Sequence, residues 1–153
     1  LLQENCVKQG CDNVRIVQLD ARSSLPFADD HFDVVLVDAP CSGTGTIGHN
    51  PEIRYFLDEK DIFDLQRKQL DILRNASKVV KPGGRLIYST CSLEREENED
   101  VVREFLSGND DFLPVTSNVP ERFLTSEGTG RIFPGDEASD GFFIFEAERR
   151  SKP

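Results

Sequence analysis

Methionine is absent from all 153 residues, and histidine occurs only as His31 and His49. Without a methionine, Leu1 is not a translation start unless processing has removed one, so we expect a fragment of a longer protein. No run of eighteen apolar residues is present, and no charged-then-apolar leader opens the chain. We therefore expect a cytoplasmic protein that neither spans a membrane nor is secreted. Neither histidine lies in a metal-binding pattern, so no metal ion is expected.

Positive charge is also scarce. The chain has 18 Lys and Arg against 28 Asp and Glu, which gives a formal net charge of −10. Nucleic-acid binding draws on basic side chains that neutralise phosphates, so this balance opposes it overall. The basic residues do cluster between Arg67 and Arg85, where Asp71 is the single acid. This segment is interpreted as a solvated helix face, with a phosphate-contacting surface as the alternative.

The four cysteines fall into two groups. Cys6 and Cys11 lack the spacing of a zinc knuckle, so each is expected to be a small buried apolar side chain. Without a secretory signal, disulfides are not the expected use of any of them. Cys41 and Cys91 instead lie in motifs of small and polar residues that follow two predicted strands.

The hydrophobic pattern predicts alternating strands and helices. Alternating β-branched residues predict a strand over 14–19, and a nearly continuous apolar run predicts a strand over 32–37 that is covered on both faces. Further elements are predicted as the end of a helix over 1–10, helices over 58–80 and 94–106, strands over 85–90 and 141–147, and an irregular segment over 107–141 with a short strand at 112–116.

This order of elements is typical of an α/β domain with a mostly parallel sheet. In such sheets, ligands bind beyond the carboxyl ends of the strands. Asp20, Asp38 and Cys91 each follow a predicted strand end. We therefore expect the three side chains to converge on one site.

Two motifs carry the chemistry. The first is Asp-Ala-Pro-Cys-Ser-Gly-Thr-Gly over 38–45, which lacks the Gly-Lys-Ser/Thr ending of a phosphate-binding P-loop. The second is Ser-Thr-Cys-Ser over 89–92. Alone, each motif fits a plain turn or a buried strand cysteine. A cysteine hydrolase is disfavoured because no histidine follows Cys91 and no general base is evident.

Together, the two motifs resemble those of the RNA cytosine-5 methyltransferases of the Nop/Sun group, in the C-terminal part of the catalytic domain. The likeness covers roughly 12–148 and includes further matching segments at 50–54, 65–73, 96–99, 131–134 and 140–143. It implies a Rossmann-like S-adenosylmethionine-dependent methyltransferase fold that is N-terminally truncated. The first two strands and the Gly-rich cofactor loop are expected to be missing, which makes 1–153 a partial catalytic domain.

The resemblance implies methyl transfer from S-adenosylmethionine to carbon 5 of cytosine in RNA, with ribosomal RNA favoured by analogy. A thiolate that adds to carbon 6 makes carbon 5 nucleophilic, so covalent catalysis solves the problem of an unreactive carbon. The family's nucleophile corresponds to Cys91, and the cysteine that assists product release corresponds to Cys41. DNA cytosine methyltransferases attack with their Pro-Cys cysteine instead, so the second motif is what indicates RNA.

Cofactor residues are implied in the same way. Asp38 corresponds to the aspartate that reaches the target base and lies against the cofactor, Asp20 to the one that contacts the adenine end, and Pro40 belongs to the same cofactor-binding motif. Cys91 needs thiolate character. A helix that starts directly after it would favour the anion, whereas Glu94, Glu96 and Glu97 oppose it unless they point to solvent.

The expected truncation has two consequences. Without the cofactor loop, we expect this chain alone to bind the cofactor weakly and to be inactive; an inactive fragment or a methyltransferase-like RNA-binding module is the alternative function. The strand over 32–37 would also lack its neighbour and leave an apolar edge. We expect the strand over 14–19 to pair with it directly, or the chain to form a homodimer through that edge.

Overall fold

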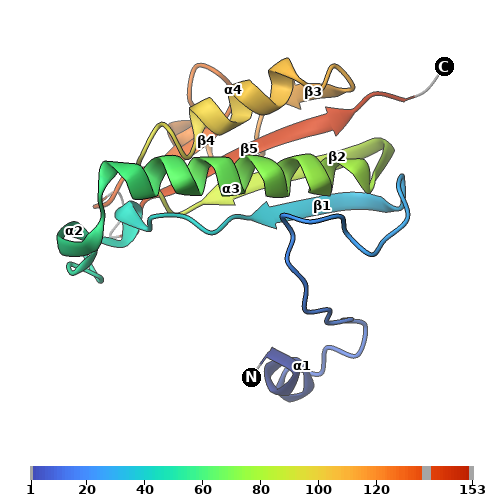
Figure 1. Cartoon of the computed structure of the whole chain (residues 1–153), viewed down its shortest axis with the longest axis horizontal. Coiled ribbons are helices and arrows are strands. Elements are labelled where there is room, and N and C mark those ends of the chain that lie inside the picture. The colour runs from blue at the N-terminus through green and yellow to red at the C-terminus, as the bar shows by residue number, and fades with distance from the viewer. Residues whose placement is uncertain (1, 136–138, 152–153) are drawn as a thin grey trace.

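The computed structural model describes residues 2–135 and 139–151. Figure 1 shows a single sheet with helices packed along it. In chain order the elements are α1 (Leu2–Lys8), β1 (Phe32–Asp38), η1 (Thr44–Thr46), α2 (Ile53–Phe56), α3 (Glu59–Lys78), β2 (Val80–Thr90), α4 (Glu99–Ser107), β3 (Phe112–Val115), η2 (Glu121–Phe123), β4 (Gly130–Ile132) and β5 (Phe142–Arg149). The predicted irregular segment 107–141 includes 136–138, which lie outside the described residues.

The sheet has the strand order β1-β2-β5-β3, and β4 also pairs with β5. β1 and β2 are parallel, with Asp38 opposite Ser89, whereas all pairings of β5 are antiparallel. The expected mostly parallel sheet is therefore limited to the β1–β2 pair. That pair is the important one for the site, because parallel strands bring their carboxyl ends to the same edge of the sheet.

The core lies between the sheet and the helices α3 and α4. On α3, the buried residues Leu70, Leu73 and Ala76 follow helical spacing and face the sheet, where Tyr88 and Phe143 are fully buried. α3 begins with a capping box in which the Asp58 and Asp61 side chains bond each other's backbone N–H. Figure 1 shows α3 running the length of β1 and β2, with α4 beside it.

The predicted strand over 14–19 is wrong. All residues of 11–20 are exposed and none belongs to a strand, so this segment does not pair with β1. It is held to α3 only beyond its end, where Asn75 Nδ2 donates to the carbonyl oxygens of Ala21 and Arg22. α1 stands apart from the sheet and buries no residue (Figure 1). Accordingly, Cys11 is exposed and Cys6 only half-buried, rather than both buried as expected.

β1 is covered on one face only, which corrects the expectation of two covered faces. Val37 is buried beneath α3, whereas Val34 and Leu36 point to the other side and are 57% and 61% exposed. Successive side chains of a strand face opposite sides of the sheet, so these two belong to the uncovered face. In the described part of the chain, no helix covers that face over β1.

Two element boundaries differ from the prediction. β2 starts at Val80 and runs through the Lys-Pro-Gly-Gly segment predicted as a turn, with a register irregularity where β1 meets it between Phe32 and Val34. α4 starts at Glu99 rather than at residue 94. The helix α3, the short strand β3 and the final strand β5 confirm the predicted elements at these places. Among the described helices, none has the length and apolar character needed to cross a membrane.

Candidate active site

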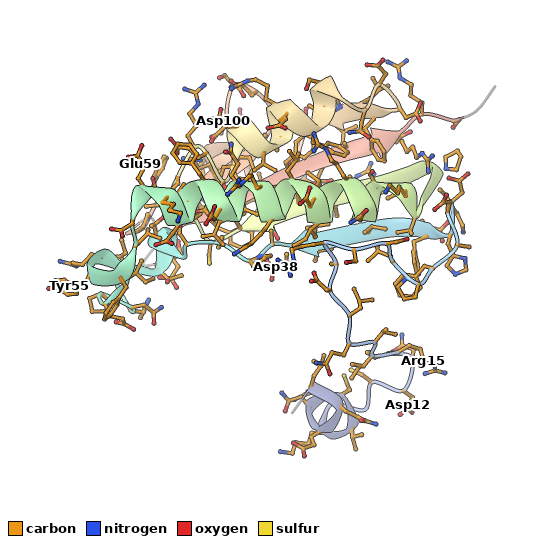
Figure 2. All side chains as sticks on the ribbon, in the orientation of Figure 1. Asp12, Arg15, Asp38, Tyr55, Glu59 and Asp100 are labelled. Carbon is orange, nitrogen blue, oxygen red and sulfur yellow. The ribbon has the colours of Figure 1, made fainter. Side chains whose placement is uncertain are left out.

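The end of β1 and the end of β2 meet at the candidate site. Asp38 is the last residue of β1, where its carboxylate is exposed (Figure 2). Its Oδ1 accepts a hydrogen bond of 3.1 Å from Ser89 Oγ on β2, and the next backbone N–H, of Ala39, donates to Ser89 O at 2.9 Å. These contacts continue the pairing of the two strands into the loop that carries the first cysteine.

The two cysteines of the motifs lie in contact. The Sγ atoms of Cys41 and Cys91 are 3.2 Å apart, and both side chains are half-buried and free of a disulfide. Fifty residues separate them in the sequence. The parallel pairing of β1 and β2 accounts for their meeting, because each cysteine follows the end of its strand by one to three residues.

The surroundings of Cys41 make its thiol a weaker acid. Burial, and then the hydrogen bond to Cys91, raise the pKa of the Cys41 thiol to about 12. Cys41 therefore keeps its proton near neutral pH, and either sulfur can be the donor in the 3.2 Å contact.

The helix α4 does not supply the expected activation. It begins eight residues after Cys91, and residues 95–98 form turns before it. A helix dipole acts within about the first turn, so α4 does not start at the thiol. The sequence-based argument for a helix directly after Cys91 is therefore wrong.

Backbone hydrogen bonds hold three loops together around the thiols. Gly45 N–H donates to Cys91 O at 2.9 Å, and Gly141 N–H donates to Gly45 O at 2.8 Å. The side chain of Thr44 adds a third link, since its Oγ1 accepts from Leu93 N–H at 2.8 Å. The first motif is thereby fixed to the second motif and to the start of β5.

A buried polar cluster beneath the thiols was missed by sequence reasoning. Glu97 was assigned to the first turn of a helix, but it is fully buried and contacts Ser42, Ser92 and Gln69. Gln69 lies on α3 and also donates to Pro40 O at 2.9 Å. The sequence feature that could have indicated this cluster is the serine that directly follows each cysteine. Two hydroxyl side chains beside the thiols need a hydrogen-bond partner when they are buried.

Asp20 is not brought into this cluster. It lies in the exposed segment 11–20, and its carboxylate accepts from the Arg22 guanidinium at 2.6 Å. That hydrogen bond lowers the pKa of Asp20 to about 2. Of the predicted site residues, the structure gathers Asp38, Pro40, Cys41 and Cys91 at one edge and leaves Asp20 paired with Arg22.

Comparison with known proteins first gives the class. The crystal structure of PH0851 superposes with a TM-score of 0.91 at 38% identity, covering 97% of this chain and 34% of that one. The structure of NSun6 from Pyrococcus horikoshii with SFG, an S-adenosylmethionine analogue, superposes with a TM-score of 0.81 at 29% identity, covering 99% and 38%. The fold is that of the Rossmann-like, S-adenosylmethionine-dependent methyltransferases.

The sequence comparisons then give the family. A model of the 16S rRNA methyltransferase RsmB/F family matches residues 1–147. The probable ribosomal RNA small subunit methyltransferase B of Bacillus subtilis (strain 168) is 36% identical over 156 residues, which cover 98% of this chain and 35% of that protein. The chain belongs to the RsmB/F family. It spans about a third of the length of the curated relatives it matches.

Proposed function

We propose that this chain carries the reacting thiols of an enzyme that methylates carbon 5 of cytosine in ribosomal RNA. The observation that supports this most is the 3.2 Å contact between Cys41 Sγ and Cys91 Sγ at the carboxyl ends of two parallel strands. A reaction that both forms and breaks a covalent enzyme–RNA bond has a use for two adjacent thiols, one that bonds the base and one that assists release. A ribosomal RNA substrate is consistent with the cytoplasm as its location.

Cys91 acts as the nucleophile in this proposal. Its sulfur forms a bond to carbon 6 of the cytosine, and the ring's electron pair makes carbon 5 nucleophilic. After carbon 5 has taken up the methyl group, a base removes its proton. The carbon 5–carbon 6 double bond then forms again, and the electron pair of the sulfur–carbon bond returns to Cys91. Cys41, whose Sγ lies 3.2 Å from that of Cys91, is placed to assist release of the methylated product.

S-adenosylmethionine, when bound, supplies the methyl group as an electrophile. The residues at the end of β1 fit this group, because the exposed Asp38 carboxylate can accept from an ammonium or amino group. Pro40 is exposed beside it, while its carbonyl oxygen is already occupied by Gln69. We propose that Asp38 and Pro40 bind the cofactor. Cofactor binding by Asp20 stays a prediction. To contact the cofactor, the Asp20 carboxylate would have to break its hydrogen bonds to Arg22.

Trapping on RNA that contains 5-fluorocytosine tests the proposal. Fluorine at carbon 5 cannot be removed as a proton, so the Cys91–carbon 6 bond persists after methylation. With S-adenosylmethionine and a 16S rRNA transcript, the native-length protein should form a denaturation-resistant adduct. Cys91→Ala should abolish that adduct and lower methylation by about 10³-fold or more.

Cys41→Ala is the matched control. It should still form the adduct, and it should also accumulate adduct on ordinary cytosine, because release is slowed while attack is not. An adduct that requires Cys41 and survives Cys91→Ala would contradict the assignment. We expect the 153-residue chain by itself to be inactive, so the same assay should show no adduct with it.

A further inference from the structure

Glu97 is a fully buried carboxylate that the proposed chemistry does not use. Its two oxygens accept four hydrogen bonds. Oε1 accepts from Ser42 N–H at 2.9 Å and from Gln69 Nε2 at 2.8 Å. Oε2 accepts from the hydroxyls of Ser42 and Ser92, each at 2.5 Å. Such short bonds between a hydroxyl and a carboxylate are the strong, charge-assisted kind.

The donors of these bonds are placed next to the thiols. Ser42 follows Cys41 directly, and Ser92 follows Cys91 directly. Because both hydroxyls bond the same oxygen of Glu97, the two cysteine loops cannot move apart without breaking a bond to a buried charge. Gln69 extends the restraint to the other side of Cys41, since its Nε2 also donates to Pro40 O.

A comparison with Glu146 separates this arrangement from ordinary burial of a carboxylate. Glu146 is also buried, but it faces the exposed cation Arg85 at 3.4 Å and the backbone N–H of Asn118. The contacts of Glu97 within the described residues are all with neutral donors. Burying a charge without a cation is costly and is tolerated where hydrogen bonds satisfy it. Here those hydrogen bonds connect the two loops that carry the reacting sulfurs.

We infer that Glu97 is a positioning residue that sets the distance between the Cys41 and Cys91 sulfurs. The expected effect of Glu97 on catalysis rests on the proposed function. In that function, release of the RNA needs Cys41 within reach of the Cys91–carbon 6 bond. The geometric part does not depend on RNA. Without Glu97, the thiols should lose their fixed separation, and release should slow more than attack.

The geometric part is tested with phenylarsine oxide on the native-length protein, without RNA or cofactor. The arsenic(III) centre binds two neighbouring thiols and loses its oxygen as water, so its affinity reports their separation. Glu97→Ala should weaken this binding by about tenfold, since misplacing groups by about 1 Å has effects of this size or larger. Glu97→Gln should restore most of it, because the amide can still accept from Ser42 N–H and the serine hydroxyls can turn to accept from its NH₂. Glu96→Gln, one residue away and half-buried, is the control and should bind as wild type.

The catalytic part is tested by the covalent adduct on ordinary cytosine RNA. Glu97→Ala should accumulate adduct while product falls by about tenfold, whereas a merely destabilised protein would lose adduct and product together. If Glu97→Ala does not fold, Ser42→Ala replaces it, because it removes the hydroxyl that bonds Glu97 Oε2 at 2.5 Å and lies 3.1 Å from Ser92 Oγ. Wild-type arsenical affinity in a folded Glu97→Ala or Ser42→Ala variant overturns the inference. A different outcome is also possible to distinguish: the wild type forms no RNA adduct, but the variants bind phenylarsine oxide more weakly. That result would refute the proposed function and keep Glu97 as the positioning residue.

Discussion

Cys41 and Cys91 touch through their sulfurs, and the surroundings of Cys41 change the acidity of its thiol. Cys41 lies in the loop after β1 and is half-buried like Cys91, and the pKa of its thiol is raised by burial first and by the hydrogen bond to Cys91 second. A raised pKa of a thiol means that the folded protein holds the proton more tightly than the unfolded chain. The stabilisation from this group is thus fully present below pH 9.0 and is lost as the pH rises toward about 12.

Alkylation measures this difference. Because the thiolate is the reactive form, iodoacetamide should label Cys41 slowly at pH 8 and increasingly as the pH approaches 12. The exposed Cys11 is an internal reference and should be labelled fully at pH 8. Peptide mass spectrometry gives both fractions from one sample. Equal labelling of Cys41 and Cys11 at pH 8 would show that Cys41 is not the proton-holding partner.

At the scale of secondary structure, apolar periodicity predicted the elements whose packing is local. α3 and β5 lie where the pattern placed them, since each buries its apolar side chains against a neighbour that is present. The strand over 14–19 did not form because a strand needs a hydrogen-bonding neighbour, and the pattern says nothing about whether that neighbour is available. The late start of α4 has a tertiary cause. Asn98 bonds Thr90 Oγ1 and Ser92 O, which holds the chain in a turn where helix propensity alone would continue the helix.

The same limit applies to the site. The proximity of Cys41, Cys91 and Asp38 could be predicted, because each lies at or just after the end of one of two parallel strands. Glu97 and Gln69 could not, because their roles come from contacts between α3 and two loops far apart in the sequence. An acidic run before a helix looks solvent-exposed by composition, and only the packed structure shows one member turned inward.

The loops around the thiols require a glycine at position 45. A Cβ there would lie 2.5 Å from Gly141 O and 2.7 Å from Cys91 O, which are backbone atoms that cannot rotate away. Gly45→Ala should therefore lower the free energy of unfolding by about 1–3 kcal/mol, as overpacking does, and reduce phenylarsine oxide binding. Gly48→Ala is the matched control, because its Cβ would meet nothing within 4 Å. Urea denaturation should place Gly48→Ala within about 0.5 kcal/mol of wild type, and a similar result for Gly45→Ala would contradict the close contact.

On the scale of the whole molecule, the sheet has two unequal edges. β3 and β4 form one edge, and β3 is a four-residue strand that contains Pro114, a residue that blunts an edge against further pairing. β1 forms the other edge with seven residues and no proline. Its exposed Val34 and Leu36 add apolar surface beside the unpaired backbone. Of the two edges, β1 has the features that favour pairing with another strand.

We therefore expect a second copy of the 153-residue chain to bind along β1. Sedimentation velocity should show a monomer–dimer equilibrium, and the double variant Val34→Lys, Leu36→Lys should weaken the dimer by at least about tenfold, because two charges on each strand would have to lose water in the interface. Both side chains are already exposed, so the double variant should keep the thermal stability of the wild-type monomer. Leu113→Lys, at an exposed position of β3, places one positive charge at the opposite edge and should leave the dimer unchanged. A chain that stays monomeric at every concentration would show that an apolar edge of seven residues is insufficient for association, and a dimer sensitive to Leu113→Lys alone would place the interface at β3.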